Sequence, residues 1–468
     1  MEAWRGEPSN VAAAQRALPH RARGNSAARE GCDAPELEQA ADVAPACAPN
    51  VQMNKHLFVL LACLFVVMVG FGITLPVLPF YVERLALEAG ASRQSIVLNV
   101  TLLTSVYALM QLIFAPLWGR WSDRIGRRPL VVIGLAGYVI AQMIFGLSTS
   151  LWLLYAARIV GGILSSATLP VWAAYVVDMT PRNERARGMA WLGTAANLGV
   201  VAGPALGGLL SRRDLHFNWS AGHLKVDGFS TPFFAAAFLG LLTLLAASRW
   251  LPESMPSAST EEPNRADATS ARTRTDWRLL LKTLSPLLAL TLAGQFALTI
   301  FEGTFALFAQ AKFAFGPAEV GYVFVVCGLV MAVFQAAAIG LLAGRISELI
   351  QISAGFAVMG TGIALLATAQ TRLFIFAFVA LLSLGMAFIA PNLTALISKR
   401  GGEQQAGASL GIQYAANSVG QAIGPLLGGV LFIWQVSAPY VFGGAVSLVL
   451  AVIVGWKAVA GRREAALA

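Results

Sequence analysis

Residues 119–128 read Gly-Arg-Trp-Ser-Asp-Arg-Ile-Gly-Arg-Arg and form a short polar stretch between two long apolar runs. Four of these ten residues are arginine, and the stretch also carries one aspartate and two glycines. The flanking runs, 102–117 and 130–147, have the composition and length typical of membrane-spanning helices. Because arginine and lysine collect in short cytoplasmic loops, the stretch predicts a cytoplasmic turn between two such helices.

The composition of the whole chain also indicates a membrane protein. Of the 468 residues, 57% are hydrophobic and 12% are charged, whereas a soluble domain carries about a quarter charged residues. The net charge of +9 would suggest a nucleic-acid partner in a soluble protein, but the placement of the charges in loops accounts for it here. The four cysteines and four histidines show no disulfide or metal-site spacing, so neither a metal nor a cofactor is expected.

Twelve apolar runs of spanning length follow, in two sets of six. At 1.5 Å per residue, each run can cross about 30 Å of hydrocarbon. We expect helices at about 57–82, 96–118, 129–148, 151–177, 188–211 and 231–251 in the first set, and at about 284–311, 317–343, 350–369, 372–397, 407–434 and 438–460 in the second.

A polar segment separates the two sets of runs. Residues 252–282 are rich in Pro, Ser, Thr, Glu and Arg, which predicts a cytoplasmic linker. The linker would join an N-terminal six-helix bundle, 53–251, to a C-terminal six-helix bundle, 283–461. Residues 462–468 are then expected to form a cytoplasmic tail.

Both termini are expected in the cytoplasm. Residues 1–52 contain no apolar segment and indicate a disordered tail, with a mis-assigned start before Met53 as the alternative. With the N-terminus inside, the inner loops and C-terminus carry eighteen Lys and Arg residues after the first run, against seven in the outer loops. This difference fixes the orientation by the positive-inside rule.

The two halves repeat each other in sequence at nearly one offset. Three pairs of segments match, which makes a chance match improbable and predicts two parallel six-helix repeats. The pairs are Gly203-Pro-Ala-Leu-Gly-Gly208 with Gly424-Pro-Leu-Leu-Gly-Gly429, Gly119-Arg-Trp-Ser-Asp123 with Gly344-Arg-Ile-Ser-Glu348, and Pro170 with Pro391.

The stretch 119–128 resembles the loop motif G-x-x-x-D-R-x-G-R-R/K between the second and third helices of the major facilitator superfamily. The resemblance implies an all-α membrane protein of twelve transmembrane helices in two six-helix pseudo-repeats. It also implies a charge network that holds the cytoplasmic ends together when the protein opens outward, with Asp178 as a further partner. Attachment to anionic lipid is the alternative role of the loop. The motif positions are Gly119, Asp123, Arg124, Gly126, Arg127 and Arg128.

The fifth run carries small residues four apart, which allow a neighbouring helix to approach closely, and a proline that should kink the helix. An ordinary packing face is one interpretation. The run also resembles the fifth-helix motif of the antiporter and exporter branches of the superfamily, which implies export. The residues concerned are Gly199, Gly203, Pro204, Gly207 and Gly208.

Two charged residues lie well inside apolar runs, at comparable depth and in opposite halves. Glu302 is the one carboxylate so placed and Arg158 the one base. Charged groups within spans are costly and usually functional. Arg158 resembles the fourth-helix arginine that the family links to proton coupling, so we expect Glu302 and Arg158 to couple transport to protons. A static ion pair, or an arginine bound to backbone carbonyls, is the alternative.

Scattered polar and aromatic residues within other spans predict a mixed cavity lining for an amphipathic organic substrate. Each is individually more typical of an interhelical hydrogen bond than of a ligand contact. The set comprises Tyr107, Gln111, Gln142, Trp172, Asn197, Gln295, Gln335, Gln413 and Asn417.

The first, fourth, fifth and eleventh runs most resemble the drug:proton antiporter branch of the superfamily, which includes the tetracycline exporters. The implied function is proton-coupled export of a small organic molecule across a bacterial inner membrane by alternating access, carried out by a monomer. A dedicated exporter of a metabolite such as a siderophore is the alternative within transport. A membrane enzyme or a transporter-like sensor belongs to another class, and the sequence contains neither clustered catalytic residues nor a signalling domain.

Overall fold

The computed structural model describes residues 55–181, 184–211, 219–221, 224–253, 277–337, 346–402 and 405–467. The expected N-terminal tail, 1–52, and most of the expected linker, 254–276, lie outside these residues. The chain divides into two units, Met1–Gln52 and Met53–Ala468, and all described residues belong to the second.

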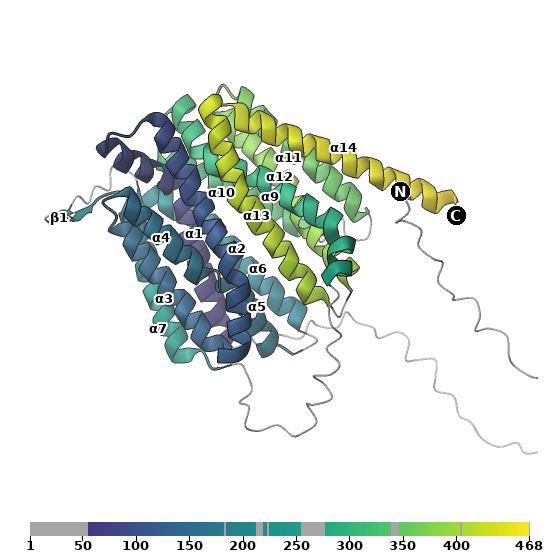
Figure 1. The fold of residues 1–468 in the computed structure, drawn as a ribbon, viewed down its shortest axis with the longest axis horizontal. Helices are drawn as coiled ribbons and strands as arrows, with labels where there is room; N and C mark the ends of the chain where they lie inside the picture. The colour runs from purple at the N-terminus through teal and green to yellow at the C-terminus, as the bar shows by residue number, and fades with distance from the viewer. Residues whose placement is uncertain are drawn as a thin grey trace, which may run out of the picture. The chain divides into compact units, whose positions relative to one another are not determined.

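The described residues form thirteen helices (Figure 1). Eleven of them are long and apolar enough to cross a membrane. The first half contains α1 (Lys55–Glu88), α2 (Arg93–Ile125), α3 (Arg127–Gly146), α4 (Leu151–Ser165), α5 (Thr168–Met179), α6 (Arg185–Leu210) and α7 (Thr231–Trp250). The second half contains α9 (Trp277–Phe313), α10 (Pro317–Ala337), α11 (Glu348–Thr368), α12 (Arg372–Gly401), α13 (Ala406–Trp434) and α14 (Ala438–Leu467).

The fourth predicted span, 151–177, is divided into α4 and α5 by a turn that begins after Ser165. Pro170 has no backbone N–H, so it cannot donate a helical hydrogen bond to the carbonyl of Ser166. The Ser165 hydroxyl also donates to the Gly161 carbonyl oxygen at 2.5 Å, a bond that bends helices. With α4 and α5 counted as one span, the twelve predicted spans are all present.

A small β-hairpin departs from the expected all-helical chain. Strand β1 (Trp219–Ala221) pairs antiparallel with β2 (Leu224–Val226) in the loop before α7. No strand is expected there from the sequence. The two strands together comprise six residues and leave the helical architecture unchanged.

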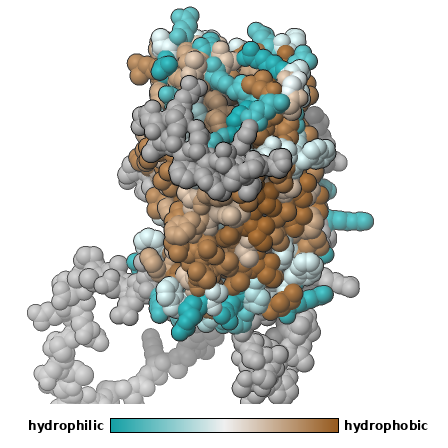
Figure 2. All heavy atoms as spheres, turned by 90° about the vertical axis from the view of Figure 1, so that its left-hand side faces the viewer, coloured by the Kyte–Doolittle hydropathy of each residue, from teal (hydrophilic) through white to brown (hydrophobic). Residues whose placement is uncertain are grey.

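A hydrophobic band crosses the face shown in Figure 2, with hydrophilic residues above and below it. Large apolar side chains lie exposed on the outside of the bundle, among them Trp152 at 83% and Trp434 at 81%. An exposed apolar surface of this extent would be unstable in water and suits a lipid environment. The protein is therefore a multi-pass membrane protein.

Glycines on α6 and α13 bring each helix against the first helix of its own half. A Cβ on Gly203 of α6 would lie 2.6 Å from the Cα of Gly72 on α1. A Cβ on Gly424 of α13 would lie 2.9 Å from the carbonyl oxygen of Phe296 on α9. The predicted repeat is therefore present in three dimensions, because equivalent glycines make equivalent backbone contacts.

The two halves meet along two interfaces, α2 with α13 and α6 with α10. The repeat relates α2 to α10 and α6 to α13, so each interface is the counterpart of the other. A Cβ on Gly208 would lie 3.1 Å from the Pro317 carbonyl oxygen, and one on Gly429 would lie 2.8 Å from Cγ2 of Thr101. Both close approaches lie at the end of the bundle opposite to residues 119–128.

We call the end that carries residues 119–128 the basic end, and the opposite end the far end. Gly411 lies five helical turns before Gly429 and therefore on the same face of α13. Gly429 is packed against α2, whereas a Cβ on Gly411 would meet no atom of the described residues within 4 Å. Helices α2 and α13 thus touch at the far end and separate toward the basic end.

Candidate functional site

A cavity of about 40 Å³ lies between the halves, with space for a few water molecules and not for a drug-sized ligand. Its lining comes from α1, α2 and α4 of the first half and from α9 and α13 of the second. The lining includes Phe71, Tyr107, Arg158, Thr299, Glu302 and Gln421.

The cavity brings Glu302 and Arg158 together from opposite halves. Glu302 is half-buried on α9, and the described residues place no cation within 4.0 Å of its carboxylate. Their shared cavity agrees with the comparable depth inferred from sequence. The described residues show no ion pair between Glu302 and Arg158, which was the static alternative considered from the sequence. Their role in proton coupling remains a prediction.

Arg158 is only 7% exposed and packs against aromatic rings. Its guanidinium carbon lies 5.2 Å from the ring centroid of Tyr107 and 5.5 Å from that of Phe145, distances typical of cation–π contacts. Tyr107 is held in turn, because its hydroxyl lies 2.9 Å from Oγ of Ser165 and accepts from Nε2 of Gln111 at 3.3 Å. The predicted residues Tyr107 and Gln111 therefore form one network with Arg158.

Other predicted cavity residues do not line this cavity. Trp172 is 1% exposed in the core of the first half. Gln413 is buried and its Nε2 donates to Oγ1 of Thr394 at 2.9 Å, an interhelical bond between α13 and α12. Asn197 is exposed, and Gln295 and Asn417 are half-buried. Contact of these residues with substrate remains a prediction for a wider state of the cavity.

Gln421, Thr104 and Thr299 also line the cavity and were not predicted from the sequence. Gln421 had a detectable signal, because it lies one turn after Asn417 on α13 and so continues a polar helix face. The two threonines had none. Thr299 donates to the Gln295 carbonyl of its own helix at 2.9 Å, as threonines in any span do.

At the basic end, Arg127 and Asp178, two members of the expected charge network, form an ion pair with Nε and Oδ2 3.1 Å apart. Arg127 also donates from Nη1 to Oγ of Ser122 at 2.6 Å and from its backbone N to Oε1 of Glu253 at 2.9 Å. Glu253, which sequence reasoning assigned to the linker, thus belongs to this network. Gly126 has a φ of 106°, a conformation that favours glycine.

These contacts at the basic end all lie within the first half. Arg128 likewise donates from Nη2 to the Ser248 carbonyl at 2.7 Å, on α7. The side chain of Asp123 lies outside the described part of the structure. A role of the motif in joining the two halves therefore remains a prediction for the state in which the basic ends approach each other.

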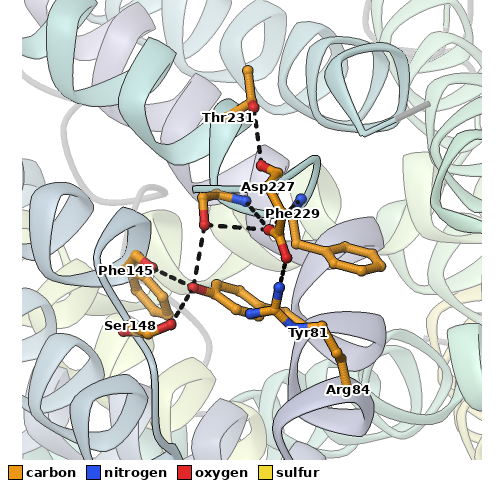
Figure 3. A network of polar contacts seen from close by, with 8 residues as sticks. Tyr81, Arg84, Phe145, Ser148, Asp227, Phe229 and Thr231 are labelled. Carbon is orange, nitrogen blue, oxygen red and sulfur yellow. Dashed lines mark hydrogen bonds and ion pairs between the residues drawn. The ribbon is translucent and has the colours of Figure 1, made fainter. Parts of the chain in front are cut away.

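At the far end, a second polar network ties α1 to α3 and α7 (Figure 3). The Tyr81 hydroxyl donates to the Ser148 carbonyl at 2.7 Å. Arg84 forms an ion pair with Asp227 and lies over the Tyr81 ring, 4.9 Å from its centroid. Oδ1 of Asp227 accepts from the backbone N of Phe229 at 3.0 Å, just before α7 begins. Sequence spacing gave no indication of this network.

One hydrogen bond at the far end crosses between the halves. Nε2 of Gln310 on α9 donates to Oε2 of Glu83 on α1 at 2.5 Å. Glu83 lies one turn beyond Pro79, which lines the cavity, and Gln310 lies two turns beyond Glu302. This contact, which we call the far-end latch, joins the two halves beyond the cavity on that side.

Comparison with known proteins relates the chain to membrane transporters. A sequence model of the Major Facilitator Superfamily matches residues 60–413 and 287–466. Tetracycline resistance protein, class D, of Salmonella ordonez is 32% identical over 380 residues, which cover 81% of this chain and 90% of that protein. Multidrug resistance protein 2 of Bacillus subtilis is 28% identical over 417 residues, which cover 87% and 97%.

A solved structure supports the fold. The crystal structure of the human organic anion transporter TETRAN matches with a TM-score of 0.61 at 23% identity, over 85% of this chain and 98% of that one. At this identity the match establishes shared architecture, and it carries no statement about what this chain binds.

Proposed function

Because the chain belongs to the major facilitator superfamily, we propose that it is a secondary transporter that exports a small amphipathic organic molecule in exchange for protons. The tetracycline and multidrug resistance proteins among its relatives support export of a drug-like molecule. The observation that carries proton coupling is the position of Glu302, a carboxylate without a described partner, in the cavity between the halves beside Arg158.

The arrangement of the helix ends supports alternating access. If the basic end is cytoplasmic, as the positive-inside rule requires, the structure corresponds to a carrier closed to the outside and separating toward the cytoplasm. Substrate would then enter from the cytoplasm and leave after the far-end latch opens. With this orientation, we propose that both termini are cytoplasmic and that the protein works as a monomer in a bacterial inner membrane.

Coupling follows from the cost of burying a charge. When both ends close, an ionised Glu302 would be enclosed in a small cavity, and uncompensated burial of a carboxylate costs several kcal/mol. Either a proton on Glu302 or a bound substrate removes that cost. An empty, unprotonated carrier therefore does not return, and each outward passage of substrate is exchanged for an inward proton.

The test is transport by the purified protein in proteoliposomes with an imposed pH gradient. A tetracycline, a quinolone and a lipophilic cation serve as probes. We expect Glu302→Gln, which mimics the protonated side chain, to abolish proton-driven accumulation while retaining substrate binding and downhill exchange.

The matched control is Glu348→Gln, which removes a carboxylate at the end of α11, outside the cavity. It should retain proton-driven transport. Uphill transport by Glu302→Gln at the parental rate would show that another carboxylate couples transport to protons.

A further inference from the structure

A second cavity lies within the first half, on the other side of Arg158 from the α9 and α13 lining. Its volume is about 30 Å³, and it is lined by α1, α2, α3 and α4. Phe71, Thr74, Tyr107 and Arg158 line both cavities, so the Arg158 side chain lies where the two adjoin. The coupling role proposed for Arg158 makes no use of this second space.

Two buried polar atoms around this cavity have no hydrogen-bond partner among the described residues, namely Oε1 of Gln142 and Nε of Arg158. Both side chains are more than nine-tenths buried, at 5% and 7% exposure. An unmade hydrogen bond at a buried group costs about 1–3 kcal/mol, and more for a charged group. Two such atoms beside one cavity therefore point to a small molecule that hydrogen-bonds to both.

The orientation of the Gln142 amide follows from its neighbours. The Tyr138 hydroxyl donates to the Val66 carbonyl oxygen at 3.1 Å, so it has only acceptor capacity left for the amide of Gln142. The hydroxyl of Tyr138 and Nε2 of Gln142 both lie directly against Gly70, where a Cβ would overlap them. Nε2 is thus directed toward Tyr138, and Oε1 is the atom left without a donor.

The chemistry of the two orphaned atoms identifies the bridging molecule. Oε1 of Gln142 needs a donor, and the N–H of Arg158 needs an acceptor. An anion would accept a hydrogen bond from Arg158 but would be repelled by Oε1 of Gln142. A cation would be attracted to Oε1 of Gln142 but repelled by Arg158. A water molecule supplies both hydrogen bonds, and 30 Å³ accommodates about two waters.

We propose that an ordered water bridges Oε1 of Gln142 to Nε of Arg158, which makes Gln142 a positioning residue for proton coupling. This inference rests on the proposed function. The rings of Tyr107 and Phe145 fix the face of the guanidinium, and the water fixes its Nε edge. The orientation of the guanidinium toward the cavity of Glu302 is thereby set. Among the residues that line the two cavities, Glu302 from α9 is the one carboxylate, and Tyr107 and Tyr138 are the other titratable groups besides Arg158.

The first test is the variant Gln142→Met, which keeps the side-chain length and removes the oxygen. We expect proton-driven transport to fall by about tenfold, as for loss of a hydrogen bond to a charged group. The KM for substrate and the rate of downhill exchange should stay within about twofold, because the substrate cavity is unchanged. A merely structural role would lower both rates together with the amount of folded protein.

Gln351→Met is the matched control, because Gln351 is also buried, at 6% exposure, and lies in α11 of the second half away from both cavities. It should leave the ratio of uphill to downhill transport unchanged. Equal ratios in Gln142→Met and the parent would overturn the inference. If the parent shows no proton-driven transport, and Glu302→Gln changes nothing, the proposed function itself fails.

A second measurement does not depend on the variant folding. A high-resolution map of the unaltered protein should show density for water within hydrogen-bond distance of both Gln142 Oε1 and Arg158 Nε. An empty cavity in a map that resolves other buried waters would overturn the inference.

Discussion

At the scale of single residues, Arg158 is the one buried cation among the described residues, and its guanidinium packs against two aromatic rings. Cation–π contacts at desolvated sites contribute about 2 kcal/mol each, which offsets part of the cost of burying a guanidinium. The contacts with Tyr107 and Phe145 therefore allow Arg158 to stay charged without consuming the carboxylate of Glu302. Glu302 is left available for a proton or a substrate.

A pair of variants at Tyr107 separates its ring from its hydroxyl. Tyr107→Phe keeps the ring beside Arg158 and loses the contact with Ser165, so proton-driven transport should stay within about twofold. Tyr107→Leu also loses the ring and should reduce proton-driven transport by about thirtyfold, the effect of losing one cation–π contact of about 2 kcal/mol. Initial rates in proteoliposomes at equal protein give the comparison. Equal rates for the two variants would mean that the ring does not hold Arg158.

Glu302 and Arg158 could be singled out from the sequence as candidates for proton coupling, because charged residues inside apolar runs are few and usually functional. The motif placed Arg127 and Asp178 in one expected charge network, without pairing them. The sequence could not predict Gln310 with Glu83, or the unpartnered oxygen of Gln142. Polar residues in spans are common, and their partners depend on how helices meet in space.

At the scale of elements, the glycine spacing of α6 predicted a close packing face and the contacts confirm it. The division of α4 from α5 was missed, although Pro170 had been noted, because a proline in a span can equally well bend a helix without interrupting it. Hydropathy alone located the spans, since a lipid environment requires long apolar helices. It said nothing about which helices touch.

Alanine at two glycines should separate a stability effect from a transport effect. Gly203→Ala places a methyl against the backbone of α1, which cannot move away cheaply, and overpacking of this kind costs about 1–3 kcal/mol. Its melting temperature should therefore fall, as measured by size-exclusion chromatography after heating.

Gly411→Ala places a methyl in open space and should leave the melting temperature unchanged. It should nevertheless slow transport, because α13 must approach α2 at the basic end when the carrier opens outward. A Gly411→Ala protein that transports at the parental rate would show that these ends never come into close contact.

At the scale of the whole molecule, the far end is closed by backbone contacts and by the latch between Glu83 and Gln310, whereas the basic end separates. Gln310→Leu removes the donor of the latch, so the population of the outward-open state should rise by up to about tenfold. Leu78 lies in the cavity wall, so a cysteine introduced there by Leu78→Cys would report the opening of the far end. Its labelling by a membrane-impermeant thiol reagent from outside should accelerate.

The labelling background is low in a protein that carries Cys32→Ser and Cys47→Ser, because the two described cysteines, Cys63 and Cys327, are buried. Lys399→Gln is the control, since it breaks an ion pair with Glu348 that lies within the second half. It should not change the labelling rate. Unchanged labelling in Gln310→Leu would mean that packing alone closes the far end.

The internal repeat relates the α2–α13 interface to the α10–α6 interface, and this relation suggests how the protein evolved. In an isologous dimer, one surface patch meets another on the partner, and the reciprocal contact forms by symmetry. The packing of α2 on α13 and of α10 on α6 reproduces that relation inside one chain. A six-helix ancestor that paired with its own copy, followed by duplication and fusion of the gene, accounts for glycines that recur in both halves. The surfaces along which the carrier opens and closes are then an inherited subunit interface.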